Sequence, residues 1–183
     1  MADVKGKKKW YEVLSTHHFG NQVIGETVAN EDKTLMGRLV KANLGNITKD
    51  IKLQNIKMSF KINEIKDGKA NTEVKGYELA TNYIKRIVRS GRSKIEDSFI
   101  LTTKDNIKVR IKPLILTKYK SKNSVLSEMR RFIRSEFGAY IQKEDYDKFV
   151  SDLVSKTVQR EIRSRVNKIY PVSLFEIRIM ERI

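Results

Sequence analysis

The stretch IKMSFKINEIKDGK, residues 56–69, contains the strand-and-turn pattern from which the fold is inferred. Apolar side chains at positions 56, 58, 60 and 62 alternate with polar ones, the period of two expected of a half-buried strand. Asp67-Gly68 then supplies a favoured two-residue hairpin turn. The sequence therefore predicts a strand, a tight turn, and a second strand that continues through TEVKGY towards Tyr77.

Short apolar groups before this hairpin predict further strands. The aromatic pair Trp10-Tyr11 opens the region, and ranges 23–27, 35–44 and 51–65 continue it. After this region the period changes, because apolar residues between 79 and 88 fall at helical spacings. Residues 78–89 are predicted to form a helix with Gly91 as its C-cap.

The second half of the chain predicts two more strands, a helical portion and a closing strand. SFILTT (98–103) and IKVRIK (107–112) are joined by a turn in which Asn106 can adopt a left-handed conformation. Helical spacings follow over about 124–137, 144–155 and 156–168, and LFEIRIM alternates within a closing strand at about 172–181.

These patterns predict an α+β fold with a central antiparallel or mixed β-barrel flanked by about four α-helices. The expected organisation is a basic leader, residues 1–9, and a single domain, residues 10–183. Its helical portion is expected at about 124–168.

Charge is the strongest functional signal in the composition. The 183 residues include 38 Lys and Arg against 22 Asp and Glu, a formal net charge of +16. Such an excess predicts a polyanionic partner. No apolar run is long enough to suggest a membrane span or signal peptide, so we expect a cytoplasmic protein without a membrane partner. The absence of cysteine excludes disulfides, thiolate metal sites and cysteine nucleophiles.

Two sequence features offer weak hints of chemistry. His17-His18 lacks further His or Cys to complete a transition-metal shell, so neither a metal site nor a cofactor is predicted. Asp50 with Glu64-Ile65-Lys66 loosely resembles the carboxylate arrangement of Mg²⁺-dependent nucleases. However, charged residues are also the default at a hairpin end. We therefore predict no catalytic residues and no enzyme, and keep the nuclease as a minor alternative.

Basic residues recur in several different predicted elements, where they could meet phosphate. One such group taken alone is usually a solvated face, but repetition with neighbouring aromatic residues favours RNA. The predicted RNA-binding residues are Lys7, Lys8, Lys9, Trp10, Arg38, Lys85, Arg86, Arg89, Arg92, Lys94, Lys108, Arg110, Lys112, Lys118, Lys120, Lys122, Arg130, Arg131 and Arg134. A free RNA-binding or chaperone-like module is one class of protein that this pattern fits.

The order of several short segments along the whole chain resembles the S3Ae family of small-subunit ribosomal proteins, which archaea and eukaryotes share. No single motif is diagnostic, and the resemblance rests on their order and spacing. The segments are Lys9-Trp10-Tyr11, Ile24-Gly25-Glu26-Thr27, Leu35 with Gly37-Arg38, Gly76-Tyr77 with Leu79, Arg86, Arg89, Ser93, Ile95, Asp97, Thr103-Lys104-Asp105, Val109-Arg110, Lys112, Ile169-Tyr170-Pro171 and Glu176-Ile177-Arg178.

The resemblance implies a β-barrel with helices, no catalysis, and a structural role in the ribosome. It implies binding to the 3′ region of small-subunit ribosomal RNA on the platform near the mRNA exit. It also implies contacts with neighbouring small-subunit proteins and a position close to mRNA. We expect the chain not to form homo-oligomers. The chain departs from the family at Asn106, where Gly is usual, and at His17-His18, and we expect it to be without the longer C-terminal tail of eukaryotic members.

Overall fold

The computed structural model describes residues 8–183. These residues divide into two compact units, with the boundary between Tyr77 and Glu78. The described part contains nine strands and five α-helices, so the predicted α+β class is confirmed.

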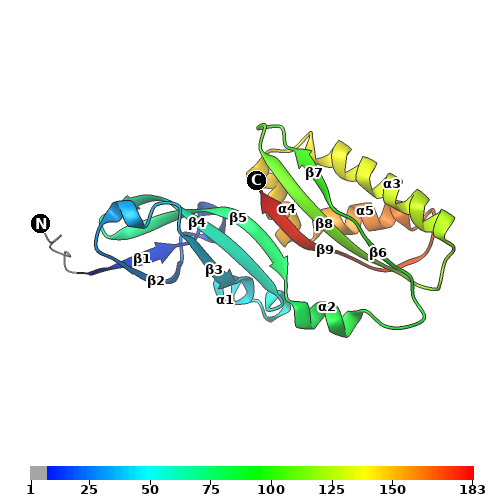
Figure 1. The fold of residues 1–183 in the computed structure, drawn as a ribbon, viewed down its shortest axis with the longest axis horizontal. Helices are drawn as coiled ribbons and strands as arrows, with labels where there is room; N and C mark the ends of the chain where they lie inside the picture. Colours follow the sequence, from blue (N-terminus) through cyan, green and yellow to red (C-terminus); the bar gives the residue numbers. More distant parts are fainter. Residues whose placement is uncertain (1–7) are drawn as a thin grey trace, which may run out of the picture. The chain divides into compact units, whose positions relative to one another are not determined.

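The first unit is a five-stranded mixed sheet (Figure 1). Its strands are β1 (Lys9–Leu14), β2 (Val23–Ala29), β3 (Leu39–Asn43), β4 (Ile56–Lys66) and β5 (Lys69–Leu79). Their order is β2-β1-β5-β4-β3, in which β1 is parallel to β5 and antiparallel to β2, and β3 is antiparallel to β4. Short helical turns join them at His17–Phe19, Asp32–Thr34, Leu44–Thr48 (α1) and Ile51–Leu53.

The hairpin predicted from residues 56–69 is present. Asp67 and Gly68 both have positive φ, 51° and 75°, as a type I′ turn requires. Along β4, Ile56, Met58, Phe60 and Ile62 are buried at alternate positions, so the period-two pattern is confirmed. This strand therefore contributes a continuous row of side chains to the core of the first unit.

The strands do not close into the predicted barrel. β2 and β3 end the strand order of the first unit and do not pair with each other in the described residues. The predicted strand 35–44 begins only at Leu39, because Gly37 takes a left-handed φ of 81° and Leu35 turns into the core. Residues 30–38 therefore form turns instead of a ladder that could seal the sheet.

The second unit is built on the long strand β8 (Lys108–Thr117). It pairs antiparallel with β6 (Lys94–Glu96), β7 (Phe99–Thr102) and β9 (Val172–Arg182). The helices α3 (Asn123–Ile141), α4 (Tyr146–Val154) and α5 (Thr157–Val166) confirm the three predicted in this region, and α5 packs on β9 (Figure 1). Phe137 of α3 lies between Phe99 and Phe175, with ring centroids 5.6 and 6.1 Å away.

The helix predicted over residues 78–89 is shorter than expected. Helix α2 spans Thr81–Ile87, buries none of its residues, and gives way to extended backbone at Val88. Leu79 is the last residue of β5 and is buried there, two positions after the buried Tyr77; the buried positions of β5 shift by one residue between Gly76 and Tyr77. Gly91 has a left-handed φ of 83°, but it lies in the turn after α2 and does not cap that helix.

Candidate nucleic-acid interface

The start of β1 presents an exposed aromatic ring beside lysines. Strand alternation sends Tyr11 into the core and Trp10 outward, and 70% of Trp10 remains exposed. Lys8 and Lys9 next to it are also exposed, whereas Lys7 lies outside the described residues. This combination offers a stacking surface with positive charge beside it.

Arg38 is tied to its own sheet. One of its guanidinium nitrogens, Nη1, donates to the Thr27 hydroxyl and, at 3.2 Å, to the Val28 carbonyl. These bonds link the segment before β3 to β2, where no ladder forms. Arg38 therefore has a structural task, although its side chain is exposed and its remaining donors stay accessible.

The basic segment around α2 is open to solvent. Lys85, Arg86 and Arg89 are exposed, and Arg86 lies over the ring of Tyr83 at 5.6 Å. None of the three has an ion pair among the described residues. Their charge is therefore available to an outside anion, while α2 itself contributes little to the core.

The continuation of this segment is partly committed to protein contacts. Arg92 Nη1 donates to the Ser173 hydroxyl at 2.8 Å, and Lys94 pairs with Glu96 at 3.0 Å. Neither residue is buried. The free positive charge of the segment thus lies towards α2.

The predicted stripe on β8 shares its face with acids. Arg110 lies opposite Glu181 on β9 and their charged groups are 3.5 Å apart. Lys112 is only half-buried and lines a shallow cavity with Glu96. Lys108 is exposed at the end of the strand. This face is therefore more nearly neutral than the sequence alone indicates, because the strand register brings in the carboxylates.

The loop after β8 presents lysines on a constrained backbone. Thr117 Oγ1 donates to the Tyr119 carbonyl at 2.6 Å, and the Tyr170 hydroxyl donates to the Lys120 carbonyl at 3.1 Å. Lys118 lies over the Tyr119 ring, whereas Lys120 and Lys122 have no ion pair among the described residues. The loop therefore holds free cations beside an aromatic ring that is 58% exposed.

Helix α3 divides its arginines between solvent and structure. Arg130 and Arg131 are exposed without an ion pair in the described part of the chain. Arg134 instead donates to both carboxylate oxygens of Asp97, at 3.0 and 3.1 Å, and lies over the Phe99 ring. Arg134 thus secures α3 to the segment between β6 and β7.

The sequence interpretation missed a basic group on α5. Lys156, Arg160 and Arg163 line a cavity of about 230 Å³ between the first turns of α5 and β9. The predicted helix 156–168 contained the run QREIRSR, so its arginines were visible in the sequence. What the sequence could not show is that they border a cavity with a buried carboxylate, Glu176, from a strand some twenty residues away.

The carboxylates of the nuclease alternative are not assembled. Asp50 accepts from the Lys52 backbone N–H at a helical turn, before β4 begins. Glu64 lies near the far end of β4, and eight strand residues span about 26 Å. The Lys66 ammonium, 2.7 Å away, holds the pKa of Glu64 below its ordinary value, as expected of an exposed ion pair.

No group of three potential ligands in the described residues could hold a metal ion. His17 and His18 lie exposed on a helical turn with their rings edge to face. Among residues 8–183, no helix has both the length and the apolar character needed to cross a membrane.

Comparison with known proteins adds an independent finding. The model of the Ribosomal S3Ae family matches residues 1–183. The chain is 35% identical to the small ribosomal subunit protein eS1 of Staphylothermus marinus over 93% of this chain and 80% of that protein. It is also 35% identical to eS1 of Desulfurococcus amylolyticus, over 96% and 84%, and 33% identical to eS1 of Halorubrum lacusprofundi, over 93% and 80%.

Proposed function

Because the chain belongs to the Ribosomal S3Ae family, we propose that it is a structural constituent of the small ribosomal subunit and binds that subunit's RNA. The relatives named above are all small ribosomal subunit proteins, which are not enzymes as a class. The observation that carries RNA binding is a set of exposed cations that have no carboxylate partner in the described residues. They lie on α2, the loop after β8, and α3.

The physical basis of binding is release of condensed counterions by lysines and arginines that reach phosphates. Lys85, Arg89 and Lys120 are not neutralised by the protein, so each can replace such a counterion. Trp10 and Tyr119 add exposed rings on which unpaired bases stack. Distributed contacts of this kind suit a large folded RNA better than a short duplex.

The resemblance to the family supports a finer proposal about where the protein binds. We propose contacts with the 3′ region of small-subunit ribosomal RNA on the platform near the mRNA exit, with neighbouring ribosomal proteins and in the cytoplasm. In this role the chain acts as one copy per subunit and has no catalytic step. We also propose that residues 10–183 act as a single domain in this role.

Sedimentation tests the assignment to the ribosome. We expect the protein to stay with small subunits after a high-salt wash of a cell extract. A free RNA-binding or chaperone-like module would be removed by the wash, and that result would overturn the structural role.

RNA affinity tests the charge argument. If about six to ten phosphates are contacted, affinity falls by about 10³ to 10⁵ between about 50 and 200 mM salt. A nearly flat salt response would contradict phosphate binding.

A double variant tests the segment around α2. Arg86→Ala with Arg89→Ala should lower RNA affinity and the salt slope while α2 remains helical, because alanine favours helix. The matched control, Lys66→Ala with Lys148→Ala, removes the same charge from lysines already paired with Glu64 and Glu144. If both double variants lose RNA affinity equally, binding depends only on net charge, and the proposed contact between the α2 segment and RNA would be wrong.

A further inference from the structure

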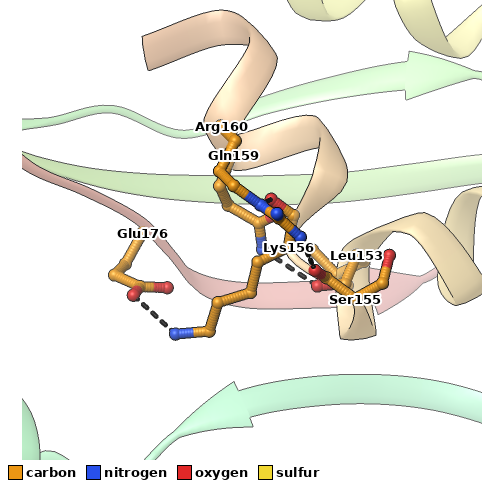
Figure 2. A network of polar contacts seen from close by, with 6 residues as sticks. All are labelled: Leu153, Ser155, Lys156, Gln159, Arg160 and Glu176. Atoms are coloured by element: carbon orange, nitrogen blue, oxygen red, sulfur yellow. Dashed lines mark hydrogen bonds and ion pairs between the residues drawn. The ribbon is translucent and has the colours of Figure 1, made fainter. Parts of the chain in front are cut away.

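The cavity at the first turn of α5 has a composition that phosphate binding alone does not explain. It measures about 230 Å³ and its polar lining consists of Ser155, Lys156, Gln159, Arg160, Arg163 and Glu176, with Phe175 as part of its apolar wall. Figure 2 shows the polar network around Lys156 and Glu176 at this site. The residues come from α5 and β9 of the second unit.

Two buried acceptors at the cavity have no donor among the described residues. Glu176 is 6% exposed, and its Oε1 accepts from Lys156 Nζ at 2.7 Å, while its Oε2 has no partner. Gln159 is 3% exposed and donates from Nε2 to the Leu153 carbonyl at 3.0 Å, so its Oε1 is left without a partner. Buried acceptors are normally satisfied, and both call for a ligand with N–H or O–H donors.

The cations at the same cavity are held in place by backbone carbonyls. Arg160 donates to the Ser155 carbonyl at 2.6 Å, and Arg163 donates to the Ser173 carbonyl at 2.9 Å (Figure 2 shows Arg160). Neither has an ion pair in the described residues, and each guanidinium keeps further N–H groups. Such fixed, unneutralised forks are suited to phosphate oxygens.

The helix end reinforces this preference for an anion. The ten-residue helix α5 has Lys156 at its N-cap, and no side chain caps its first backbone N–H groups. These groups and the helix dipole favour negative charge at the same end of the cavity. Three cations against one carboxylate leave the site positive despite Glu176.

We infer that this cavity receives one unstacked RNA nucleotide, with its phosphate on Arg160 and Arg163 and the N–H groups of its base on Glu176 and Gln159. This inference rests on the proposed RNA-binding function. A backbone phosphodiester by itself carries no donor for the two buried acceptors, and a basic side chain would meet three cations. The volume of this cavity is below the roughly 300–1,000 Å³ of pockets that hold drug-sized ligands. A cavity of this size suits a single base packed against Phe175.

The test compares three RNA hairpins that differ at one position: a single-guanosine bulge, whose base carries N1–H and N2 amino donors for the two acceptors, the same bulge without its base, and no bulge. Fluorescence anisotropy with the full chain at one fixed salt concentration gives the three affinities. We expect the guanosine bulge to bind about tenfold tighter than the other two, as a hydrogen bond to a charged group allows. An equal gain for the baseless bulge would show a phosphate site without base recognition and would overturn the inference.

Glu176→Gln should abolish the preference for the guanosine bulge. Lys156 attracts the amide oxygen, which places an NH₂ donor where Oε2 was and where the base presents its own N–H. The matched control is Glu181→Gln on the same strand, whose carboxylate is exposed and lies 3.5 Å from Arg110. Both variants gain one unit of positive charge, so the ratio of affinities isolates the cavity. A preference that survives in Glu176→Gln would overturn the inference.

Photo-crosslinking of the unmodified protein keeps the inference testable if Glu176→Gln fails to fold. With 6-thioguanosine at the bulge, we expect crosslinks within residues 153–163 or 173–178. Crosslinks confined to other residues would refute the site. If the protein binds all three hairpins equally but with strong salt dependence, the cavity inference fails and the proposed function stands. If it binds none, both fail.

Discussion

Two contributions of Lys156 to stability, its ion pair with Glu176 and its left-handed backbone, can be measured separately by substitution. This residue joins α4 to α5 with a left-handed φ of 60°, and its ammonium lies 2.7 Å from Glu176. Left-handed backbone is unfavourable for residues with a Cβ, whereas glycine adopts it readily. We therefore compare Lys156→Ala, which loses the ion pair and keeps the strain, with Lys156→Gly, which loses both.

The expected magnitudes follow from burial. Removing one partner of a fully buried ion pair costs about 3–5 kcal/mol, and we expect about 2–3 kcal/mol for Lys156→Ala because 34% of the Lys156 side chain is exposed. Lys156→Gly should be about 1 kcal/mol less destabilising, since relief of the left-handed penalty of about 1–2 kcal/mol exceeds the entropy cost of glycine.

Urea unfolding monitored by circular dichroism measures these differences in the free energy of unfolding. Lys148→Ala is the control, because its pair with Glu144 is exposed on the lysine side and should contribute little to stability. Two results would refute the reasoning. If Lys156→Ala costs no more than the control, the pair with Glu176 does not stabilise the fold. If glycine is no better than alanine, the backbone at Lys156 is not strained.

Three further predictions concern other parts of the chain. Burial and the hydrogen bond to Asp152, 2.7 Å long, raise the pKa of Tyr140. The stabilisation that the protonated hydroxyl gives the fold is therefore complete below pH 10 and is lost as pH rises through the raised pKa. Tyr140→Phe should lower the free energy of unfolding by about 1.5–3 kcal/mol at neutral pH and reduce its fall at alkaline pH, as measured by urea titrations at several pH values. Gly45→Ala should cost about 1–3 kcal/mol in thermal unfolding, because its Cβ would lie 3.0 Å from the backbone of Gln54; an unchanged melting temperature would contradict this close approach. Trp10→Ala should leave the melting temperature unchanged, because the ring is 70% exposed, and should weaken single-stranded RNA binding by about 1–3 kcal/mol; lost stability with unaltered affinity would assign the ring to folding instead.

Local sequence patterns predicted the secondary structure best where neighbouring residues alone decide it. The Asp67-Gly68 turn and the alternation along β4 were both readable, since each depends on backbone preferences within a few positions. Boundaries were less predictable. Leu79 fits a helical spacing with Tyr83 and also a strand alternation with Tyr77, and only the burial of β5 decides between them.

The open sheet of the first unit shows a limit of the same kind. The apolar group at 35–44 predicted a strand, but Gly37 takes a left-handed turn and its N–H bonds to the Ile62 carbonyl at 2.8 Å. Arg38 then links to β2 through its side chain rather than its backbone. Which of these connections forms depends on distant strands, which local spacing does not encode.

The sequence by itself determined the class of fold, the excess of positive charge and the resemblance to a ribosomal family, because these depend on composition, periodicity and order along the chain. Only the tertiary structure decided which cations are available. Strand register pairs Arg110 with Glu181, and helix packing pairs Arg134 with Asp97, whereas Lys85 and Lys120 stay free of such partners in the described residues. The cavity beside Glu176 has the same origin, since α5 and the next element, β9, meet there through packing that local spacing does not encode.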